Sequence, residues 1–363
     1  MEQKKQTGIG KKILKIIGWI LLAVVAVALF FVIYLSVTEY KPKDREQIKV
    51  SGKADKSIKA GDTISVLSWN LGYGALGDNA DFFFDGGKAV LPSDETRVKE
   101  NVNAFYTEIG KEDPDVVLLQ ETDINSKRSY GINMVNEIAK HTEGYENSFA
   151  YNYNVKYVPY PIPPMGKIGS GLATFSSYPV KEAERIALPC PFTWPVRVGN
   201  LKRCLLINRV PIKDSDKELV LVNLHLEAYD DGEGKVKQTQ MLRDILETEY
   251  KKGNYVIAAG DFNQTFSNTD TTMYPQHKGA WKSGIIDVAD IGNDFSCIMD
   301  SSVPSCRSLE TTYDTNEKIK NCQYWMLDGF IVSKNIKVES MKTKDLHFKN
   351  TDHNPIILKA VLK

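Results

Sequence analysis

Residues 351–363 read TDHNPIILKAVLK and place a polar cluster directly before a strand pattern. The apolar residues that recur over 356–362 predict a final β-strand. Asp352 and His353 stand at the mouth of that strand, and a turn by itself does not require an acid beside a histidine. We therefore expect other strands of the chain to end in polar residues that lie near this pair.

From residue 63 onward, short apolar runs alternate with amphipathic stretches. The runs with the length and composition of strands are 64–70, 115–121, 171–176, 204–210, 219–226, 255–261, 326–333 and 355–362. Apolar residues at helical spacing predict one helix that begins after Ser93 and ends at Gly110, and a second through Leu242. Several strands are apolar on both faces, so we expect one α/β domain whose sheets are covered by helices or by another sheet.

Polar side chains gather at the ends of these predicted strands. The residues are Asn70, Glu121, Asn223, His225, Asp261, Asn263, Asp328, Asp352 and His353. Taken singly, each has a plain structural explanation, because an Asn or Asp after a strand makes a turn and a lone His on an apolar strand is commonly a core residue. Taken together, they would be an unexplained polar cost in an apolar framework unless one site drew them together.

The motifs that carry these residues resemble, in order, those of the endonuclease/exonuclease/phosphatase superfamily of metal-dependent phosphoesterases. They lie between residues 63 and 363 and read SWNLGYG, VVLLQETD, GSGLATFS, LVNLHLEAYDD, AAGDFNQ, WMLDGFIVS and TDHNPI. One motif alone is weak, whereas the ordered series at strand ends is specific. The resemblance implies a four-layer α/β sandwich, in which two packed mixed β-sheets are flanked by helices and the site lies where the sheets meet at their edge.

A phosphate ester repels an attacking nucleophile, so its hydrolysis requires charge neutralisation and a water aimed in line with the leaving oxygen. Oxygen ligands select a hard cation such as Mg²⁺, with Mn²⁺ as the alternative, and the absence of a His/Cys cluster in the sequence argues against zinc. We expect Glu121 to be the principal metal ligand, supported by Asn70 and Asp352. Some family members carry an acid where this chain has Gly72, which predicts a thinner metal shell and disfavours a second metal.

The resemblance also implies roles for the remaining residues. Asp261 is similar to the carboxylate that orients or deprotonates the attacking water, while Asn263 and Asn223 would hold phosphate oxygens. His353 would contact the phosphoryl group, and Asp328 would fix its tautomer and keep it cationic. The acid and the histidine that open the last strand would then face the metal and the phosphate respectively, because neighbouring side chains leave a strand in different directions.

His225 narrows the resemblance within the superfamily. Deoxyribonucleases and sphingomyelinases resemble this chain in having a histidine there, as an acid for the leaving group, whereas abasic-site endonucleases do not. The segment that follows, LEAYDDGEGKVKQTQMLRDI, is closer to the sphingomyelinase-like branch.

The N-terminal segment predicts the location of the protein. Residues 16–37 are 22 uncharged residues, long enough to cross a hydrocarbon core of about 30 Å at about 1.5 Å per residue. We interpret them as an uncleaved transmembrane signal anchor; the competing interpretation is a cleaved signal peptide, which has a shorter apolar region and a small-residue cleavage site. In a single-pass protein of the cell membrane, 1–15 would be a basic cytoplasmic tail, 38–62 a charged linker and 63–363 the catalytic domain outside the cytoplasm.

The net charge of the chain and its predicted membrane anchor favour some classes of substrate over others. The chain has 46 basic and 46 acidic side chains; five lysines and one glutamate give its first 15 residues a net charge of +4, so the remainder carries −4. A weakly acidic body disfavours binding of bulk nucleic acid. We therefore expect a membrane-anchored phosphodiesterase that acts on a phospholipid head group or other small diester. A nuclease outside the cytoplasm and a phosphomonoesterase are the alternatives, and a catalytically silent binding module is the least favoured.

Two further features bear on the site and are left open by the sequence. The segment 151–171, with four tyrosines among prolines, fits either a wall of the cleft or a proline-stiffened surface loop. Basic side chains that could form a rim for an anionic substrate are Arg128, Arg197, Lys202, Arg203 and Arg209.

Five cysteines occur without a Cys-x-x-Cys motif. Outside the cytoplasm a disulfide between Cys297 and Cys306 is open, although the odd number favours buried thiols for most of them.

Overall fold

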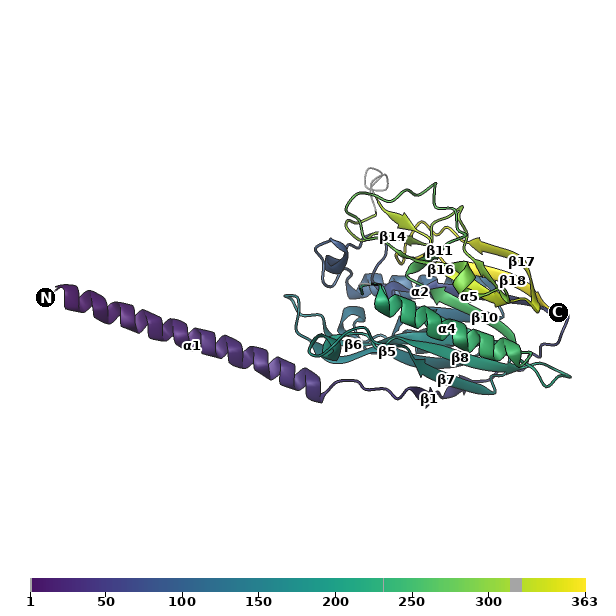
Figure 1. Ribbon diagram of the computed structural model, residues 1–363, viewed down its shortest axis with the longest axis horizontal. Helices are drawn as coiled ribbons and strands as arrows, with labels where there is room; N and C mark the ends of the chain where they lie inside the picture. The colour runs from purple at the N-terminus through teal and green to yellow at the C-terminus, as the bar shows by residue number, and fades with distance from the viewer. Residues whose placement is uncertain (1, 231, 314–321) are drawn as a thin grey trace.

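Two seven-stranded mixed β-sheets form the centre of the protein in this computed structural model, which describes residues 2–230, 232–313 and 322–363 (Figure 1). The first sheet contains β1 (Arg45–Gln47), β7 (Glu182–Ala187), β8 (Cys204–Pro211), β9 (Glu218–His225), β10 (Tyr255–Asp261), β13 (Phe295–Ile298) and β16 (Asp328–Ser333). The second contains β2 (Val50–Gly52), β3 (Thr63–Asn70), β4 (Val116–Asp123), β5 (Glu146–Val158), β6 (Gly166–Ser176), β17 (Ile336–Thr343) and β18 (Ile356–Leu362).

Five α-helices and several short elements accompany the two sheets in the described residues. The α-helices are α1 (Glu2–Val37), α2 (Glu95–Glu112), α3 (Met134–Ala139), α4 (Glu233–Lys251) and α5 (Val288–Ile291). Short 3-10 helices are η1 (Gly72–Gly74), η2 (Phe83–Asp85), η3 (Lys127–Ser129) and η4 (Val196–Gly199). Two small sheets pair β11 (Gln264–Phe266) with β12 (Gly284–Ile286) and β14 (Cys306–Arg307) with β15 (Tyr324–Trp325).

Strand order brings the ends of the central strands to one edge. The first sheet runs β1-β7-β8-β9-β10-β16-β13, and the second runs β17-β18-β3-β4-β6-β5-β2. The pairs β9–β10 and β3–β4 are parallel, whereas β16 and β18 are antiparallel to their central neighbours. The carboxyl ends of β3, β4, β9 and β10 and the amino ends of β16 and β18 therefore lie at the same edge of the sandwich.

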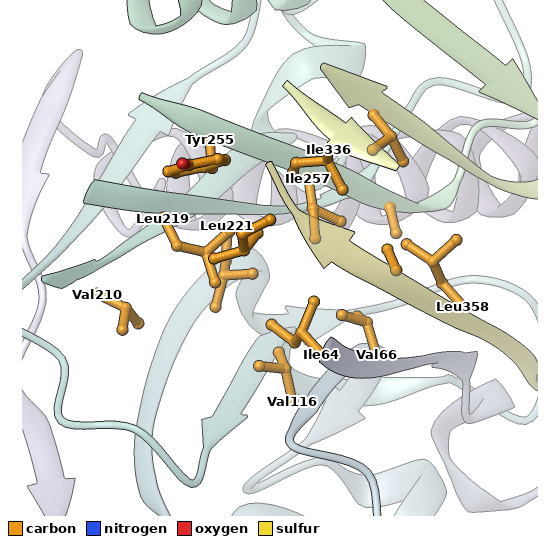
Figure 2. Close-up of a cluster of buried hydrophobic side chains, with 14 of the residues drawn as sticks. Ile64, Val66, Val116, Val210, Leu219, Leu221, Tyr255, Ile257, Ile336 and Leu358 are labelled. Atoms are coloured by element: carbon orange, nitrogen blue, oxygen red, sulfur yellow. The ribbon is translucent and has the colours of Figure 1, made fainter. Parts of the chain in front are cut away.

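Four layers pack around three apolar clusters. The central cluster lies between the two sheets, where residues such as Val66 and Leu358 face Leu221 and Ile257 (Figure 2). A second cluster packs α2 and α3 on the outer face of β3 and β4, and a third packs α4 on the outer face of β9 and β10. The structure confirms the expected four-layer α/β sandwich, because each central strand is apolar on both faces and each face needs a covering layer.

The predicted helix after Ser93 is present and begins at Glu95, but it ends later than expected. Asp94 caps α2 by accepting a hydrogen bond from the backbone N–H of Arg97 at 2.8 Å. The helix continues past Gly110, the predicted stop, because the left-handed conformation that ends it belongs to Asp113, with φ 42°.

The segment 151–171 is a β-hairpin, not a loop throughout. Its two arms belong to β5 and β6, which pair antiparallel, and only the residues between Val158 and Gly166 form the connection. The sequence pattern does not reveal β5, because the polar and aromatic residues of this strand lack the continuous apolar pattern of the central strands.

Residues 38–62 differ from the charged linker that the sequence suggested. Arg45–Gln47 pair with β7 and Val50–Gly52 pair with β5, so the segment adds an edge strand to each sheet. Backbone hydrogen bonds make these strands, and edge strands tolerate the charged side chains that made the segment look unstructured.

Helix α1 leaves the domain on the side of β5 and β6 (Figure 1). Its apolar stretch, Ile9–Val37, is long and apolar enough to cross a membrane, and no residue of its most apolar window is buried in the protein. Length and composition fit a signal anchor as well as a signal peptide.

All five cysteines are free thiols. Cys297 lies in β13 and Cys306 in β14, and neither takes part in the disulfide that the sequence left open.

Candidate active site

Strand parity directs the predicted residues into the gap between the sheets. On β3, Ile64 and Val66 face the central cluster, and Asn70 follows them at even spacing. The same alternation on β10 points Asp261 inward after Ile257. Beyond the apolar side chains, the two sheets therefore present polar side chains to each other at the shared edge.

Asn70 joins the ends of three strands. Its Nδ2 donates a hydrogen bond to Oδ2 of Asp261 at 3.0 Å and lies 3.4 Å from Oε1 of Glu121. The same atom is 3.5 Å from Nε2 of His353. Asn70, Glu121, Asp261 and His353, predicted from four separate motifs, therefore form one cluster.

Two histidines flank the Asp261 carboxylate. Nε2 of His225 lies 3.3 Å from Oδ2 of Asp261, and Nε2 of His353 lies 3.7 Å from the same oxygen. The other oxygen, Oδ1, accepts a hydrogen bond from the backbone N–H of Asn263 at 2.8 Å. Oδ2 is consequently the Asp261 atom that faces both histidines.

Asp328 holds His353 from the opposite side of the ring. Oδ2 of Asp328 is 2.8 Å from Nδ1 of His353, and both side chains are buried. Burial by itself would lower the pKa of His353, but the neighbouring Cys306, Asp328 and Asp352 raise that pKa well above its ordinary value. His353 is therefore held as a cation with Nε2 directed toward Asp261.

Glu121 faces the site because the backbone bends there. By parity with Leu119 its side chain would point toward the helices, but the register of β4 shifts between Leu119 and Thr122. Glu121 takes a left-handed φ of 49° within this irregularity. The bend turns the carboxylate toward Asn70.

A second carboxylate stands near Glu121. Burial raises the pKa of Glu121, and the charge of Asp352 raises it further while Arg128 acts against the shift. Gly72 leaves room for Asp352, because a Cβ on this glycine would lie 2.7 Å from Oδ1 of Asp352 at a left-handed φ of 49°. An acid at position 72 would therefore collide with the carboxylate that this chain keeps.

Asn223 does not join the cluster, which corrects its expected role as a phosphate ligand. Its Nδ2 donates to the carbonyl oxygens of Leu119 at 3.1 Å and Ala173 at 2.9 Å, and its Oδ1 accepts from Gln120 at 2.8 Å. Asn223 is fully buried and its amide is occupied by these partners. It precedes His225 by two residues, which places it about 7 Å deeper between the sheets.

Asn263 lies at the rim of the cluster. It adopts a left-handed φ of 50°, and its Nδ2 donates to the carbonyl oxygen of Leu226 at 3.0 Å. The amide carries a second N–H and an oxygen that this bond does not use.

Arg203 is a residue of this region to which the motifs gave no role. It is 4% exposed, and its Nε lies 3.8 Å from Oε2 of Glu227. Within the part of the chain that the structure describes, its Nε and Nη1 have no hydrogen-bond partner. Burial lowers the pKa of His225 well below its ordinary value, and the charges of Arg203 and His353 lower it further. The guanidinium therefore acts electrostatically on the site.

The other members of the expected basic rim have partners elsewhere. Arg128 is buried against Asp123, which accepts from Nε at 3.1 Å and from Nη2 at 3.0 Å, and its guanidinium stacks on the ring of Tyr73. Arg197 and Lys202 pair with Glu39, and Arg209 pairs with Glu218 and Glu249. These side chains support the framework.

Two more residues near the site carried no sequence signal. Cys306 comes together with Asp352 and His353, so that one ligand atom of each lies within 4.8 Å of the others. The sequence contains no such His/Cys cluster, and only folding creates it. Asp85, in η2, has its pKa raised to about 7 by burial and by the charges of Asp352 and Glu121.

The sequence profile of the Endonuclease/Exonuclease/phosphatase family matches residues 67–341. A search of curated proteins finds no match. Among solved structures, an endonuclease/exonuclease/phosphatase from Beutenbergia cavernae DSM 12333 is similar at a TM-score of 0.54 and 17% identity, with 83% of this chain and 72% of that chain covered.

Two other structures are similar at comparable levels. ANGEL2, a 2',3'-cyclic phosphatase in complex with adenosine-2',3'-vanadate, has a TM-score of 0.54 and 14% identity over 87% of this chain and 99% of that chain. D. rerio TDP2 with a single-strand DNA product has a TM-score of 0.51 and 16% identity over 82% of this chain and 99% of that chain. At these identities the similarity establishes the fold alone. The family profile covers most of the sequence and all strands that supply the cluster except β18, so the chain belongs to the endonuclease/exonuclease/phosphatase family of metal-dependent phosphoester hydrolases.

Proposed function

We propose that this protein is a membrane-anchored, Mg²⁺-dependent phosphodiesterase that acts outside the cytoplasm on a phospholipid head group or another small phosphodiester. The observation that carries the proposal is the position of His225 and His353 on either side of Asp261, 3.3 and 3.7 Å from its Oδ2. One histidine is placed to contact the phosphoryl group, and the other is placed to supply a proton to the departing alkoxide.

Glu121, Asp352 and Asn70 fit a hard divalent cation. Their donor atoms are carboxylate and amide oxygens, and the two carboxylates lie close enough for the charge of Asp352 to raise the pKa of Glu121. The ion would neutralise phosphate charge and lower the pKa of a water. Among the described residues, the group that includes Asp352 and His353 has one soft ligand, the Cys306 thiol. Burial raises the pKa of this thiol to about 12, which disfavours the thiolate that zinc requires.

Asp261 is the base in this proposal. Asn70 donates to Oδ2 and the backbone N–H of Asn263 donates to Oδ1, so the carboxylate is fixed in orientation. Burial raises its pKa from the ordinary range, which makes it a stronger base for an attacking water than an exposed carboxylate.

His353 contacts the phosphoryl group as a cation. Its Nδ1 is engaged by Asp328, which leaves the Nε2 proton for a phosphate oxygen. Burial and the charges of Arg203 and His353 keep His225 neutral in the free enzyme. A bound phosphodiester anion offsets those two positive charges and favours protonation of His225, which then gives its proton to the leaving oxygen.

Arg203 replaces Asn223 as our candidate for holding a phosphate oxygen. The free Nε and Nη1 donors support this role, since a buried guanidinium with unused donors is costly unless a ligand satisfies them. Glu227, 3.8 Å away, limits the rotation of the guanidinium.

The membrane anchor rests on α1. A helix whose apolar stretch runs over Ile9–Val37 holds the domain beside the lipid surface, which raises the effective concentration of lipid substrates. Five lysines precede residue 16, where the uncharged run of 22 residues begins, and this arrangement favours a cytoplasmic N-terminus.

The test compares a chromogenic phosphodiester with the matching phosphomonoester, using the full chain in detergent micelles with Mg²⁺. We expect turnover of the diester that is lost with chelator and lost in His353→Ala. Arg203→Lys serves as a charge-matched comparison, and we expect it to raise KM because the ammonium of a lysine lacks the planar, fixed pair of donors that the guanidinium offers.

Other outcomes redirect the proposal. A preference for the monoester would identify a phosphomonoesterase. Diester turnover that extends to DNA, with binding weakened by salt, would identify a nuclease. No turnover of either ester, together with no Mg²⁺ binding, would leave a binding module.

A further inference from the structure

We infer that exposed apolar side chains on four loops form a surface that inserts into the lipid–water interface and turns the active site toward the bilayer. This surface, the interfacial surface, consists of Phe84, Tyr160, Ile162, Trp194, Val196 and Tyr229. The inference rests on the proposed retention of α1 as an anchor and adds the orientation of the domain on the membrane.

Exposed apolar side chains concentrate on these loops. Among the described residues after α1, ten large hydrophobic side chains are exposed, and six of them belong to the interfacial surface. Ile162 is 93% exposed at the tip of the β5–β6 hairpin, and Trp194 is 59% exposed beside η4. Single exposed apolar residues are ordinary, whereas a group confined to neighbouring loops marks a binding surface.

Direct contacts place this surface at the end of α1. Phe31 of the helix stacks on Tyr157 of β5 with ring centroids 5.9 Å apart. Nε1 of Trp194 donates to Oγ of Ser36 at 3.0 Å. Arg197, in η4, donates from Nε to Glu39 at 3.0 Å, just beyond the last turn of α1. The loops therefore lie where the apolar helix would leave the membrane.

Ring contacts continue the surface from the hairpin to the other loops. Phe83 meets Tyr160 at 6.1 Å between ring centroids, and Phe84 meets Tyr229 at 5.9 Å. The hydroxyl of Tyr229 donates to Oδ1 of Asp85 at 3.1 Å. Three loops that are distant in sequence are thus held together as one aromatic surface.

The same surface borders the active site. Tyr229 lies four residues after His225, on the loop that follows the carboxyl end of β9. That end carries the candidate catalytic cluster, so the edge of the sandwich that holds the site is the edge that faces the interfacial surface. A lipid head group would reach the site without leaving the membrane surface.

Lipid is the occupant that the composition favours. Trp and Tyr are the residues that collect at the level of lipid head groups, because their rings are apolar and their N–H or O–H groups remain hydrated. Exposed Lys127, Lys156 and Lys167 flank the hairpin, and Nζ of Lys127 donates to the carbonyl oxygen of Pro164 at 2.9 Å. Basic side chains beside apolar ones match a surface that contains anionic lipids.

The first experiment measures membrane depth and does not depend on turnover. Ile162→Cys in the full chain is labelled with an environment-sensitive fluorophore and placed in nanodiscs that contain anionic lipid and lipids with quenching acyl chains. The matched control is Ser215→Cys, which is exposed and precedes β9 at the end opposite the site. Four of the native cysteines are buried, and Cys190 is replaced by Ser in both proteins.

We expect the label at position 162 to be quenched by the lipids and the label at position 215 to remain unquenched. β9 is eight residues long, so the two ends of the sandwich are separated by about 25 Å, well beyond contact quenching. Equal quenching at both positions, or none at either, would overturn the inference. This readout stands apart from the proposed function, because a protein with no lipid turnover still gives a clear result.

The second experiment connects the surface to lipid substrates. Ile162→Asp and Val196→Asp are assayed on vesicles and on a soluble chromogenic diester, with Ser215→Asp as the variant of equal charge change. We expect turnover on vesicles to fall about tenfold in the first two proteins, because each loses the free energy of transferring one apolar side chain out of water. Turnover of the soluble diester should not change. An equal fall in all three proteins, or no fall in any, would contradict the inference.

Discussion

Replacing Asp328 by Asn tests whether the buried pair with His353 contributes to catalysis. Asn keeps the size of the side chain but removes the charge that stands 2.8 Å from Nδ1 of the ring. A hydrogen bond to a charged group contributes about 1.5–3 kcal/mol. At about 1.4 kcal/mol for each factor of ten, we expect kcat/KM to fall about 10- to 150-fold.

The assay is diester turnover by the full chain with Mg²⁺, at a temperature where thermal unfolding shows the variant to be folded. A double-mutant cycle makes the test specific, because Asp328 is argued to act only through His353. In the His353→Ala background, Asp328→Asn should therefore cause little additional loss. The reasoning is refuted if Asp328→Asn keeps kcat/KM within about twofold of the wild type, or if its effect is fully retained when His353 is absent.

Three further predictions concern the metal, the framework and pH. Glu121→Gln should weaken Mg²⁺ binding about tenfold or more in a calorimetric titration; unchanged affinity would exclude it as a ligand. Gly260→Ala should lower the free energy of unfolding by about 3 kcal/mol, because its Cβ would lie 1.9 Å from a carbonyl oxygen of β9. Its control, Gly110→Ala, lies in a helix with open space around the new Cβ and should raise the free energy of unfolding by about 0.5–1 kcal/mol. Equal melting temperatures of the two variants would contradict the predicted difference. Burial alone would raise the pKa of Glu249, but hydrogen bonds led by that from Arg209 lower this pKa from 4.5 to about 2. The ionised Glu249 therefore stabilises the fold above pH 4.5, and this stabilisation is lost as the pH falls toward 2. The free energy of unfolding should depend less on pH over that range in Glu249→Gln, and an unchanged pH dependence would refute this role of Glu249.

Three of the predicted site residues that the structure brings to the cluster lie on regular strands. Asn70, Asp261 and Asp328 occupy positions whose parity matches inward-facing apolar neighbours, so alternation alone gives their direction. Alternation along a strand predicts which face of the sheet a side chain takes, but not how far from the edge of the sandwich it lies. Asn223 has the parity of His225 but lies deeper, where main-chain groups occupy its amide.

Glu121 shows the opposite case. Its parity points it away from the site, and only the irregularity of β4 and a left-handed backbone turn it inward. The resemblance named this residue as a candidate metal ligand, and that role stays a prediction. The direction of its side chain depends on the pairing of β4 with β6, which the local sequence does not contain.

Edge strands and loops were hidden for a related reason. Arg45–Gln47 and Val50–Gly52 are held by backbone hydrogen bonds to strands more than 90 residues away in sequence, so their own side chains carry no apolar pattern. The interfacial surface is likewise assembled from four loops, beside the end of α1.

The amino-acid sequence by itself determined the α/β class with covered sheets and the apolar N-terminal segment, and it named the candidate site residues, because hydrophobic period and short motifs are local properties. Only the tertiary structure decided which side chains meet: that Asn223 is buried in the framework, that Arg203 and Cys306 lie near the site, and that α1 ends beside exposed aromatic loops. These arrangements depend on contacts between segments that are distant in the chain, and no local pattern of residues encodes such distances.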